Sequence, residues 1–584
     1  MDINRRTVMR SATGVAALAA FGVAEGTTGT AFAATSSSGS TSSASSAYSL
    51  EFDATAWSYD STNDVYYQIG KVYVGNPAAP DYENLSIYVP GAYLTATANS
   101  DGTTYTAKAN PKGTVGAYSG RTAPIVIPVN TPGYAQQAPA TSYSYSSVSA
   151  YLEAGLVYVW PGLRGRDSST STRSDAAPWG VTDVKAAVRF LRYNRSVLPG
   201  STEDIVLFGM SGGGAQDTVA GVSGDSPLFD PYLRTIGAAM EDAQGRPLSD
   251  AVAGVMAWCP ITNLAEANLS YEWNMGQFAS TGTRASTTWS SAYSADLAKA
   301  WPKYLNRLGL RDEHGRRLGL TESGSGTYLA GSYYDHLIGV ITTSLNNFLS
   351  DNTFPYTITT QGGPPGSGQT GTSTTYETVA DYIAYLNTDS TWVTYDATTN
   401  TATVSGLEGF VNSQKTANKP VGAFDGYSRG QGENSVFAMG LGAPSHFAPL
   451  TRDVIKANET TYATYSDWNT DYGVAAYDSD FAKKDSVGKD MAWRGDAYNP
   501  LYFLSPAFGG YRQSQVARHW RIRTGIMQGD TANTTEINLQ LALRNYGIRD
   551  VDFATVWALA HTMAERTGDS TTNFIDWVES VVKK

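Results

Sequence analysis

The spacing of glycines around Ser211 is typical of a nucleophilic serine. Gly209-Met-Ser211-Gly-Gly213 fits the pattern G-x-S-x-G. The apolar residues 205–208 predict a short buried strand before the serine, and the glycines after it allow a helix to begin at once. So sharp a turn leaves room only for glycine two residues to either side. We therefore predict a catalytic serine, with the N–H of Gly212 as an oxyanion donor. A glycine-rich turn without chemistry is the alternative.

A serine hydroxyl needs a base to take its proton and an acid to orient that base. In α/β hydrolases these residues follow the order Ser, acid, His, and the histidine lies in the loop after the last strand. Only His561 meets this condition, and Asp530 is the only carboxylate in the loop after the preceding predicted strand. Asp530 could instead cap the helix that follows it. The five histidines are residues 314, 336, 446, 519 and 561.

The second oxyanion donor should come from the loop 130–134, which follows the apolar run 123–129. Pro132 has no N–H to donate. Gly133 or Tyr134 would therefore have to donate, and Gly133 is the candidate that we carry forward.

The elements that must position these residues predict a doubly wound, mostly parallel sheet of the α/β-hydrolase kind. Residues 49–95 alternate apolar and polar side chains, which indicates an antiparallel start. Continuous apolar runs then suit parallel strands that are covered on both faces. Between them, residues 181–193 have the spacing of an amphipathic helix. The runs are 123–129, 155–160, 205–208 and 251–258, and later strands are expected at 519–527 and 551–557, with helices at 535–546 and 574–582.

The strand–helix alternation breaks between residues 263 and 418. This segment has helical pieces, such as 297–308, and a loop rich in Gly, Pro, Ser and Thr at 361–375. It is too long for a connection, so we interpret it as a lid inserted between two parts of the hydrolase core, 48–262 and 419–584. A separately folded binding module is the alternative.

The N-terminus is interpreted as a targeting segment and not as part of the fold. Arg5-Arg6, an apolar run at 12–23 and Ala31-Phe-Ala33 predict a twin-arginine signal peptide over residues 1–33. A Ser/Thr-rich linker follows at 34–47. We expect export to the cell envelope or beyond it, with no membrane span in the mature protein. An uncleaved anchor is the alternative.

Composition narrows the classes of partner. The formal net charge of −12 argues against binding to nucleic acid or to an anionic membrane surface. The chain has one cysteine, so no internal disulfide can form. This residue, Cys259, follows an apolar strand and is expected to be a buried, inert thiol. The oligomeric state does not follow from the sequence.

Several separate blocks give the chain a resemblance to the bacterial tannases, which are serine esterases of α/β-hydrolase fold that cleave galloyl esters. The resemblance runs from about residue 83 to the C-terminus and implies that Ser211 is the nucleophile and His561 its base, without a metal or an organic cofactor. The blocks that carry it, besides the glycine-rich turn, are residues 161–166, 184–194, 259–263, 271–273 and 516–523.

The resemblance also implies a binding site for the phenolic ring. It places Lys419 and Glu433 where the family holds the hydroxyl groups of the galloyl ring, and a carboxylate and an ammonium suit that task. One departure concerns the acid. The family has two acidic residues two positions apart, and here these positions hold Gln528 and Asp530. Asp530 is then either the triad acid or a substrate contact.

The sequence therefore predicts a secreted serine esterase for galloyl or related aromatic acid esters of plant polyphenols. The alternatives are a feruloyl-type carboxylesterase, a serine peptidase of the same fold, and a catalytically inactive polyphenol-binding homologue.

Overall fold

The computed structural model describes residues 48–324, 326–359, 371–439 and 443–582. The predicted signal peptide and linker, residues 1–47, lie outside the described residues. Within these ranges the model contains no helix whose length and apolar character would let it cross a membrane.

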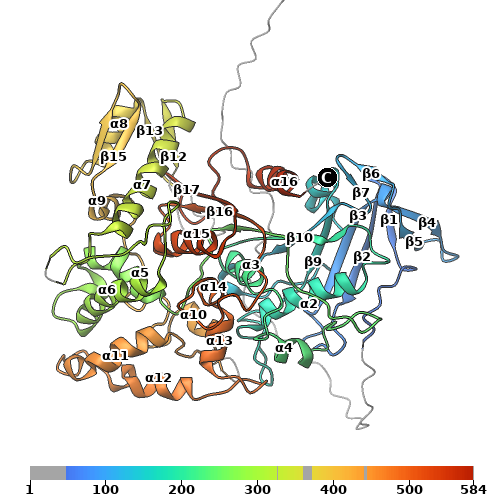
Figure 1. The fold of residues 1–584 in the computed structure, drawn as a ribbon, viewed down its shortest axis with the longest axis horizontal. Coiled ribbons are helices and arrows are strands. Elements are labelled where there is room, and N and C mark those ends of the chain that lie inside the picture. Colours follow the sequence, from blue (N-terminus) through green and yellow to red (C-terminus); the bar gives the residue numbers. More distant parts are fainter. Residues whose placement is uncertain (1–47, 325, 360–370, 440–442, 583–584) are drawn as a thin grey trace, which may run out of the picture. The chain divides into compact units, whose positions relative to one another are not determined.

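Nine strands form one large sheet, in the order β1-β2-β3-β9-β8-β10-β11-β16-β17 (Figure 1). Strands β8 to β11, β16 and β17 pair in parallel, and almost every residue of β8, β9 and β11 is buried. This agrees with the prediction from the continuous apolar runs. The parallel strands are β8 (Pro124–Val129), β9 (Val157–Pro161), β10 (Ser201–Met210), β11 (Gly254–Trp258), β16 (His519–Gly525) and β17 (Asp550–Val556).

The other edge of the sheet is antiparallel, as the alternating sequence predicts. Strands β1 (Ser58–Asp60), β2 (Val65–Val72) and β3 (Asn84–Pro90) pair antiparallel with one another, and β3 pairs in the same sense with β9. Two short hairpins follow β3 in the sequence. They are β4 (Leu94–Ala98) with β5 (Tyr105–Ala109), and β6 (Thr114–Val115) with β7 (Tyr118–Ser119).

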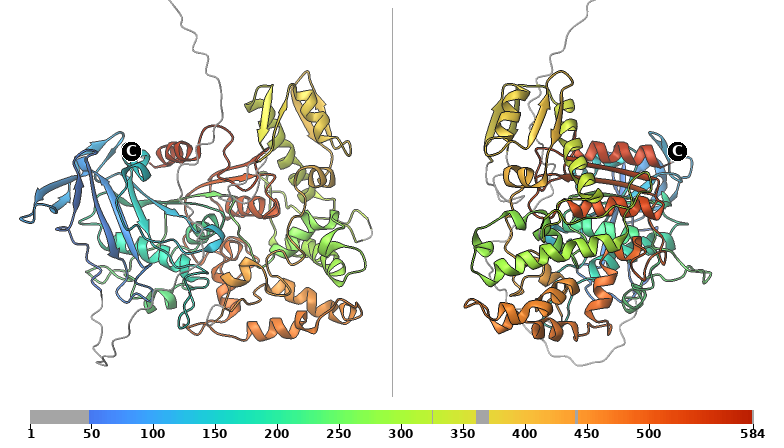
Figure 2. Two further views of the ribbon diagram at one scale, coloured as in Figure 1. Left: turned by 180° about the vertical axis from the view of Figure 1, so that it is seen from behind. Right: turned by 60° about the vertical axis from the view of Figure 1, so that its left-hand side comes forward.

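Helices cover both faces of the parallel part. Helices α2 (Trp179–Tyr193), α3 (Gly212–Val222) and α15 (Thr534–Tyr546) lie on one face, and α16 (Ser570–Val581) lies on the other, beside α1 (Ser149–Glu153). In the right-hand view of Figure 2, α16 lies above β16 and β17 and α15 lies below them. The four later core elements thus begin and end within a few residues of the predicted positions. The short helix α4 (Asp230–Thr235) packs against α2.

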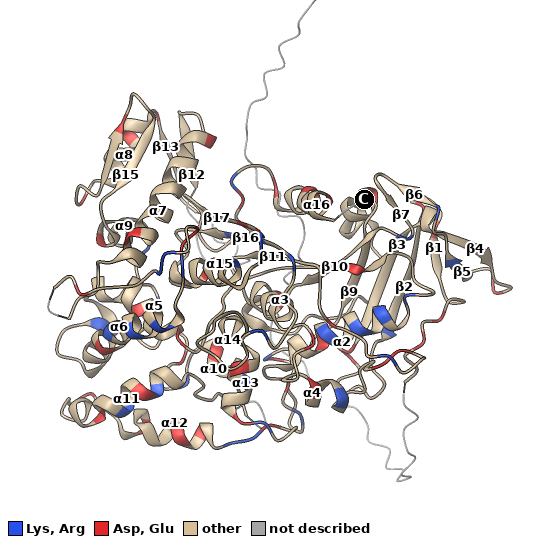
Figure 3. Ribbon diagram, viewed as in Figure 1, with Lys and Arg blue, Asp and Glu red and all other residues tan. Residues whose placement is uncertain are grey.

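Helix α2 carries several basic side chains, visible as blue segments in Figure 3. They are buried and not a solvated face. Lys185 Nζ lies 2.8 Å and Arg189 Nη2 lies 2.6 Å from the carboxylate of Asp250, just before β11. Burial lowers the pKa of Lys185, and the Asp250 charge opposes this shift. The cluster ties α2 to the strand next to β10.

The main sheet gains no strand between β11 and β16 within the described residues, so its second part begins at residue 519 and not near residue 419. The inserted segment is therefore longer than the predicted range 263–418. Part of the predicted loop 361–375 lies outside the described residues, and residues 373–375 belong to strand β13.

The elements of the insertion are α5 (Ala267–Asn274), α6 (Trp289–Leu308), α7 (Ser332–Asp351), β12 (Tyr356–Thr359), β13 (Ser373–Tyr376), α8 (Val379–Leu386), β14 (Val393–Asp396), β15 (Thr401–Val404), α9 (Leu407–Gln414), α10 (Gly432–Val436), α11 (Pro449–Tyr462), α12 (Val474–Phe481), α13 (Met491–Ala497) and α14 (Pro500–Leu504). Two small hairpins, β12-β13 and β14-β15, are separate from the large sheet. Short 3-10 turns occur at Gly91–Tyr93, Pro132–Tyr134, Tyr145–Ser147, Gly276–Phe278, Gly282–Arg284 and Thr470–Tyr472.

Candidate active site

Ser211 lies at the turn between β10 and α3 in a strained backbone conformation. Its φ is 60° and its ψ is −122°, a region that a non-glycine residue seldom adopts. Its N–H donates to the carbonyl oxygen of Trp258, 2.9 Å away, which ties the turn to the end of β11. A Cβ on Gly209 or Gly213 would overlap Val129 O of the neighbouring strand. Sterics therefore explain the glycines on both sides of the serine.

The loop after β8, which carries the predicted donor Gly133, lies against Gly212 at the start of α3. A Cβ on Gly212 would lie 3.2 Å from the amide nitrogen of Gly133. Tyr134 N–H already donates to Thr131 O at 2.9 Å, and the Tyr134 hydroxyl donates to Ile261 O at 2.6 Å. Both amide nitrogens lie near the position of a Cβ on Gly212, and of the two only that of Gly133 has no hydrogen-bond partner in the described residues.

His561, in the loop after β17, hydrogen-bonds Gln528. The distance from His561 Nδ1 to Gln528 Oε1 is 2.6 Å. The amide orientation of Gln528 is fixed, because its Nε2 donates to Glu536 Oε1 at 2.6 Å and to Thr524 Oγ1 at 2.7 Å. Since Oε1 can only accept, His561 carries its proton on Nδ1 and leaves Nε2 free to act as a base.

Asp530, the predicted triad acid, lies farther from the histidine. Its Oδ2 is 3.6 Å from His561 Nδ1, and its side chain is 40% exposed. The hydrogen bond expected of Asp530 is therefore made by Gln528. Asp530 also does not cap α15, because the N-cap residue is Asn533. Its charge still acts on the histidine. Burial lowers the pKa of His561, Asp530 opposes that shift, and two lysines, Lys419 and Lys415, reinforce it.

Ser211 Oγ forms no hydrogen bond in the described part of the chain, to His561 or to any other group. Its side chain is largely buried, as is that of His561. In enzymes without bound substrate, catalytic hydrogen bonds are often long and tighten only when the substrate is present.

Lys419 and Glu433, which the sequence places in the phenol site, lie close together. Lys419 Nζ is 3.7 Å from Glu433 Oε1 and 4.1 Å from the centre of the Phe424 ring. Both side chains are mostly buried. The charge of Lys419 lowers the pKa of His561.

Arg166 is a residue of this region whose role the sequence analysis missed. Its Nε is buried without a hydrogen-bond partner, and in the described residues its guanidinium has no carboxylate partner. Nη2 lies 3.2 Å from the position of a Cβ on Gly133, and Nη1 lies 2.7 Å from that on Gly432. Its backbone N–H donates to Tyr134 O at 3.0 Å. The second arginine of the block 161–166 was the available signal.

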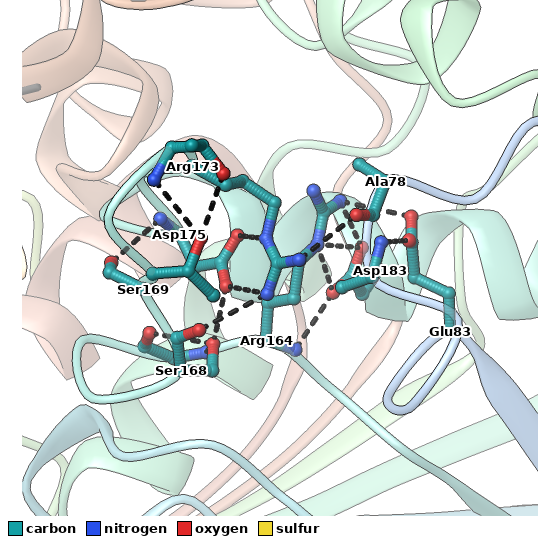
Figure 4. Close-up of polar contacts among 12 residues, drawn as sticks. Ala78, Glu83, Arg164, Ser168, Ser169, Arg173, Asp175 and Asp183 are labelled. Carbon is teal, nitrogen blue, oxygen red and sulfur yellow. Dashed lines mark hydrogen bonds and ion pairs between the residues drawn. The ribbon is translucent and has the colours of Figure 1, made fainter. Parts of the chain in front are cut away.

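A buried ionic network anchors the segment that carries Arg166 (Figure 4). Arg164 Nη2 is 2.6 Å from Asp183 Oδ1 of α2 and 3.3 Å from Glu83 Oε1. Arg173 lies nine residues after Arg164 in the sequence, and its Nε is 2.7 Å from Asp175 Oδ1. Both ends of the segment are therefore fixed, and Arg166 lies between them.

A match to a family model indicates the class of protein to which this chain belongs. A family described as BD-FAE, a hydrolase domain, matches residues 115–296, which include β8 to β11 and the serine turn. No curated protein matches the sequence. The family match and the sheet with helices on both faces define an α/β-hydrolase fold.

Solved structures then give the particular resemblance. The tannase of Fusobacterium nucleatum is 25% identical, with a TM-score of 0.66, over 92% of this chain and 100% of that one. A tannase of Lactobacillus plantarum is also 25% identical, with a TM-score of 0.62 over the same shares. A tannin acyl hydrolase in complex with 3,4-dihydroxybenzoate is 26% identical, with a TM-score of 0.63, over 91% and 99%. The predicted resemblance to the bacterial tannases is confirmed, and with it a tannase-like esterase fold.

Proposed function

We propose that this chain is a serine esterase that hydrolyses galloyl or related phenolic acid esters through an acyl-enzyme. The observation that carries the proposal is the strained turn at Ser211, with the loop that carries Gly133 packed against Gly212. The similarity to a tannin acyl hydrolase solved in complex with ethyl gallate supports the choice of substrate class.

In the proposed reaction Ser211 Oγ attacks the ester carbonyl carbon while His561 Nε2 takes the hydroxyl proton. The negative charge on the carbonyl oxygen is held by the N–H groups of Gly212 and Gly133. The C–O bond to the alcohol then breaks, and the alcohol leaves with the proton from His561. Water, activated by the same imidazole, attacks the acyl-serine and releases the acid.

Lys419 and Glu433 supply the phenol contacts in this proposal. Glu433 accepts hydrogen bonds from phenolic O–H groups, and Lys419 donates to a phenolic oxygen. Lys419 and Glu433 lie close to each other, and the charge of Lys419 acts on His561. Both observations support binding of the phenolic ring beside the reacting ester.

The test is initial-rate hydrolysis of methyl gallate against methyl ferulate by the wild type and by Ser211→Ala. We expect the wild type to prefer methyl gallate and the variant to lose turnover by several orders of magnitude. A preference for the ferulate would favour the feruloyl-type alternative. No turnover of either ester would overturn the proposal and leave the serine peptidase and the inactive polyphenol-binding homologue.

Export is a separate part of the proposal and rests on the N-terminal sequence: Arg5-Arg6, the apolar run at 12–23 and Ala31-Phe-Ala33. Expression of the full chain beside an Arg5→Lys/Arg6→Lys variant tests it. We expect the wild type in the envelope or medium and the variant inside the cell. Equal distribution of the two proteins would contradict export by this route.

A further inference from the structure

Gln528 connects His561 to a carboxylate that lies farther inside the protein. The amide accepts from His561 Nδ1 at 2.6 Å and donates to Glu536 Oε1 at 2.6 Å. Glu536 belongs to α15 and is 1% exposed. Imidazole, amide and carboxylate thus form an unbroken hydrogen-bonded chain.

The carboxylate at the end of this chain is held firmly. Besides Gln528, Thr524 Oγ1 lies 3.2 Å and Thr531 Oγ1 lies 3.3 Å from Glu536 Oε1. A buried carboxylate needs such donors and a nearby cation. The cation is Lys415, whose Nζ donates to the backbone oxygen of Gln528. Burial raises the pKa of Glu536 to about 7, and the charge of Lys415 opposes that rise.

The other ionisable groups around this chain are few. Cys259 faces it through Thr524 and Gly525, and burial raises the pKa of its thiol to about 11, so the thiol is neutral. Burial also lowers the pKa of Lys415 to about 8. Asp530 and Lys419 act on His561 from the more exposed side.

We propose that Glu536 is the displaced acid of the catalytic triad, which positions and polarises His561 through Gln528. Gln528 alone can hold the Nδ1–H tautomer, but a neutral amide cannot stabilise an imidazolium as a carboxylate does. When His561 takes the serine proton on Nε2, no proton moves along the chain. The amide N–H of Gln528 stays bonded to the carboxylate of Glu536, which strengthens the acceptor on Oε1.

This inference rests on the proposed function, because it assigns a role within the same reaction. It differs from the prediction that Asp530 is the triad acid. Asp530 remains a nearby charge, whereas Glu536 lies in line with the hydrogen bond that orients the imidazole.

The test compares kcat and KM for methyl gallate at pH 8, above the pKa of about 7 at which Glu536 ionises, among wild type, Glu536→Gln, Gln528→Met and the double variant. We expect Glu536→Gln to lower kcat roughly tenfold to a hundredfold with KM within about twofold, because the charge acts on the transition state. Gln528→Met already breaks the connection between His561 and Glu536. The kcat of the double variant should therefore equal that of Gln528→Met. Additive losses would indicate a merely structural role and overturn the proposal.

A titration of His561 by NMR gives a readout without substrate. The wild type should show the Nδ1–H tautomer, and Glu536→Gln should keep that tautomer while the pKa of His561 falls by less than about one unit, because Glu536 is only partly ionised in the pH range where His561 titrates. Glu266→Gln is the matched control, another buried glutamate changed to its amide, and it should leave both kcat and this pKa unchanged.

The outcomes separate the two proposals. Unchanged kcat and an unchanged His561 pKa in Glu536→Gln overturn the role of Glu536 even if wild type is an active esterase. An inactive wild type overturns the esterase function. The NMR titration alone then tests whether Glu536 acts on His561 through Gln528. If Glu536→Gln fails to fold because Lys415 is left unpaired, Glu536→Gln/Lys415→Met is compared with Lys415→Met in both measurements.

Discussion

At the scale of single residues, Asp530 has a distinct and measurable influence on the candidate base. It lies 3.6 Å from His561 Nδ1 without a hydrogen bond, and its charge raises a pKa that burial lowers. A general base must be neutral to act. The acid limb that belongs to His561 should therefore lie below the ordinary histidine value of about 6.5. Protonation of Glu536, whose pKa is about 7, should reduce kcat/KM at most by the factor expected for Glu536→Gln.

Removing this charge should move the acid limb to still lower pH. In Asp530→Asn the imidazolium of His561 loses its nearest anion, so its pKa falls and the base stays neutral in more acidic solution. The kcat at pH 8 should fall only several-fold, because Gln528 keeps the hydrogen bond to Nδ1. A pH–rate profile of both proteins measures this. A loss of several orders of magnitude at pH 8 would identify Asp530 as the triad acid.

Gly212 offers a second prediction at this scale. A Cβ there would collide with the amide of Tyr134 and press on the oxyanion loop. Gly212→Ala should lower kcat by about 10²–10³, the typical effect of losing one oxyanion donor. Gly339→Ala in α7 is the comparison, because a Cβ at that helical glycine would meet no atom within 4 Å. Equal activity of both variants would remove these amides from the mechanism.

At the scale of elements, the segment between β9 and α2 shows how buried charges position a side chain near the site. Asp183 holds both the guanidinium and the backbone N–H of Arg164. Burial raises the pKa of Asp183, and the Arg164 charge opposes this. Removing Asp183 leaves Arg164 buried, with only the more distant carboxylate of Glu83, at 3.3 Å, to balance its charge.

Asp183→Asn should therefore lower the free energy of unfolding by about 3–5 kcal/mol, as measured by urea denaturation. Arg166→Met, within the same segment, should change the stability little, because that guanidinium has no carboxylate partner in the described residues. It should instead lower kcat/KM. A stability loss in Arg166→Met as large as in Asp183→Asn would show that Arg166 is part of the anchoring network.

The sequence predicts those helices and strands that have a clear hydrophobic periodicity. Continuous apolar runs predicted β8 to β11, and spacing of three and four predicted α2, because burial on two faces or one stripe leaves such patterns. The hydrogen bond between His561 and Gln528 could not be predicted, because it depends on how two loops meet in space. Glu536 was missed for the same reason. Nothing in the sequence of α15 distinguishes it from a polar residue on any amphipathic helix.

At the scale of the whole molecule, the insertion and the hydrolase core share one hydrophobic core. Buried side chains between Phe52 and Val582 form a single connected cluster that includes the insertion. The described residues from 48 to 582 also belong to one compact unit. Within the insertion, Trp289 packs against an aromatic group: Tyr293, Tyr427, Tyr462, Trp468 and Tyr472.

We therefore expect the insertion and the core to unfold together. Heating should give one calorimetric transition, with coincident changes in far-ultraviolet circular dichroism and tryptophan fluorescence. Trp289→Ala should lower the stability by about 3–5 kcal/mol through the cavity it leaves, and the single transition should shift as a whole. A separate binding module would behave differently: the variant would split the curve into two steps, and only the first would move. Two steps in the wild type would favour the module that the sequence left open over a lid continuous with the core.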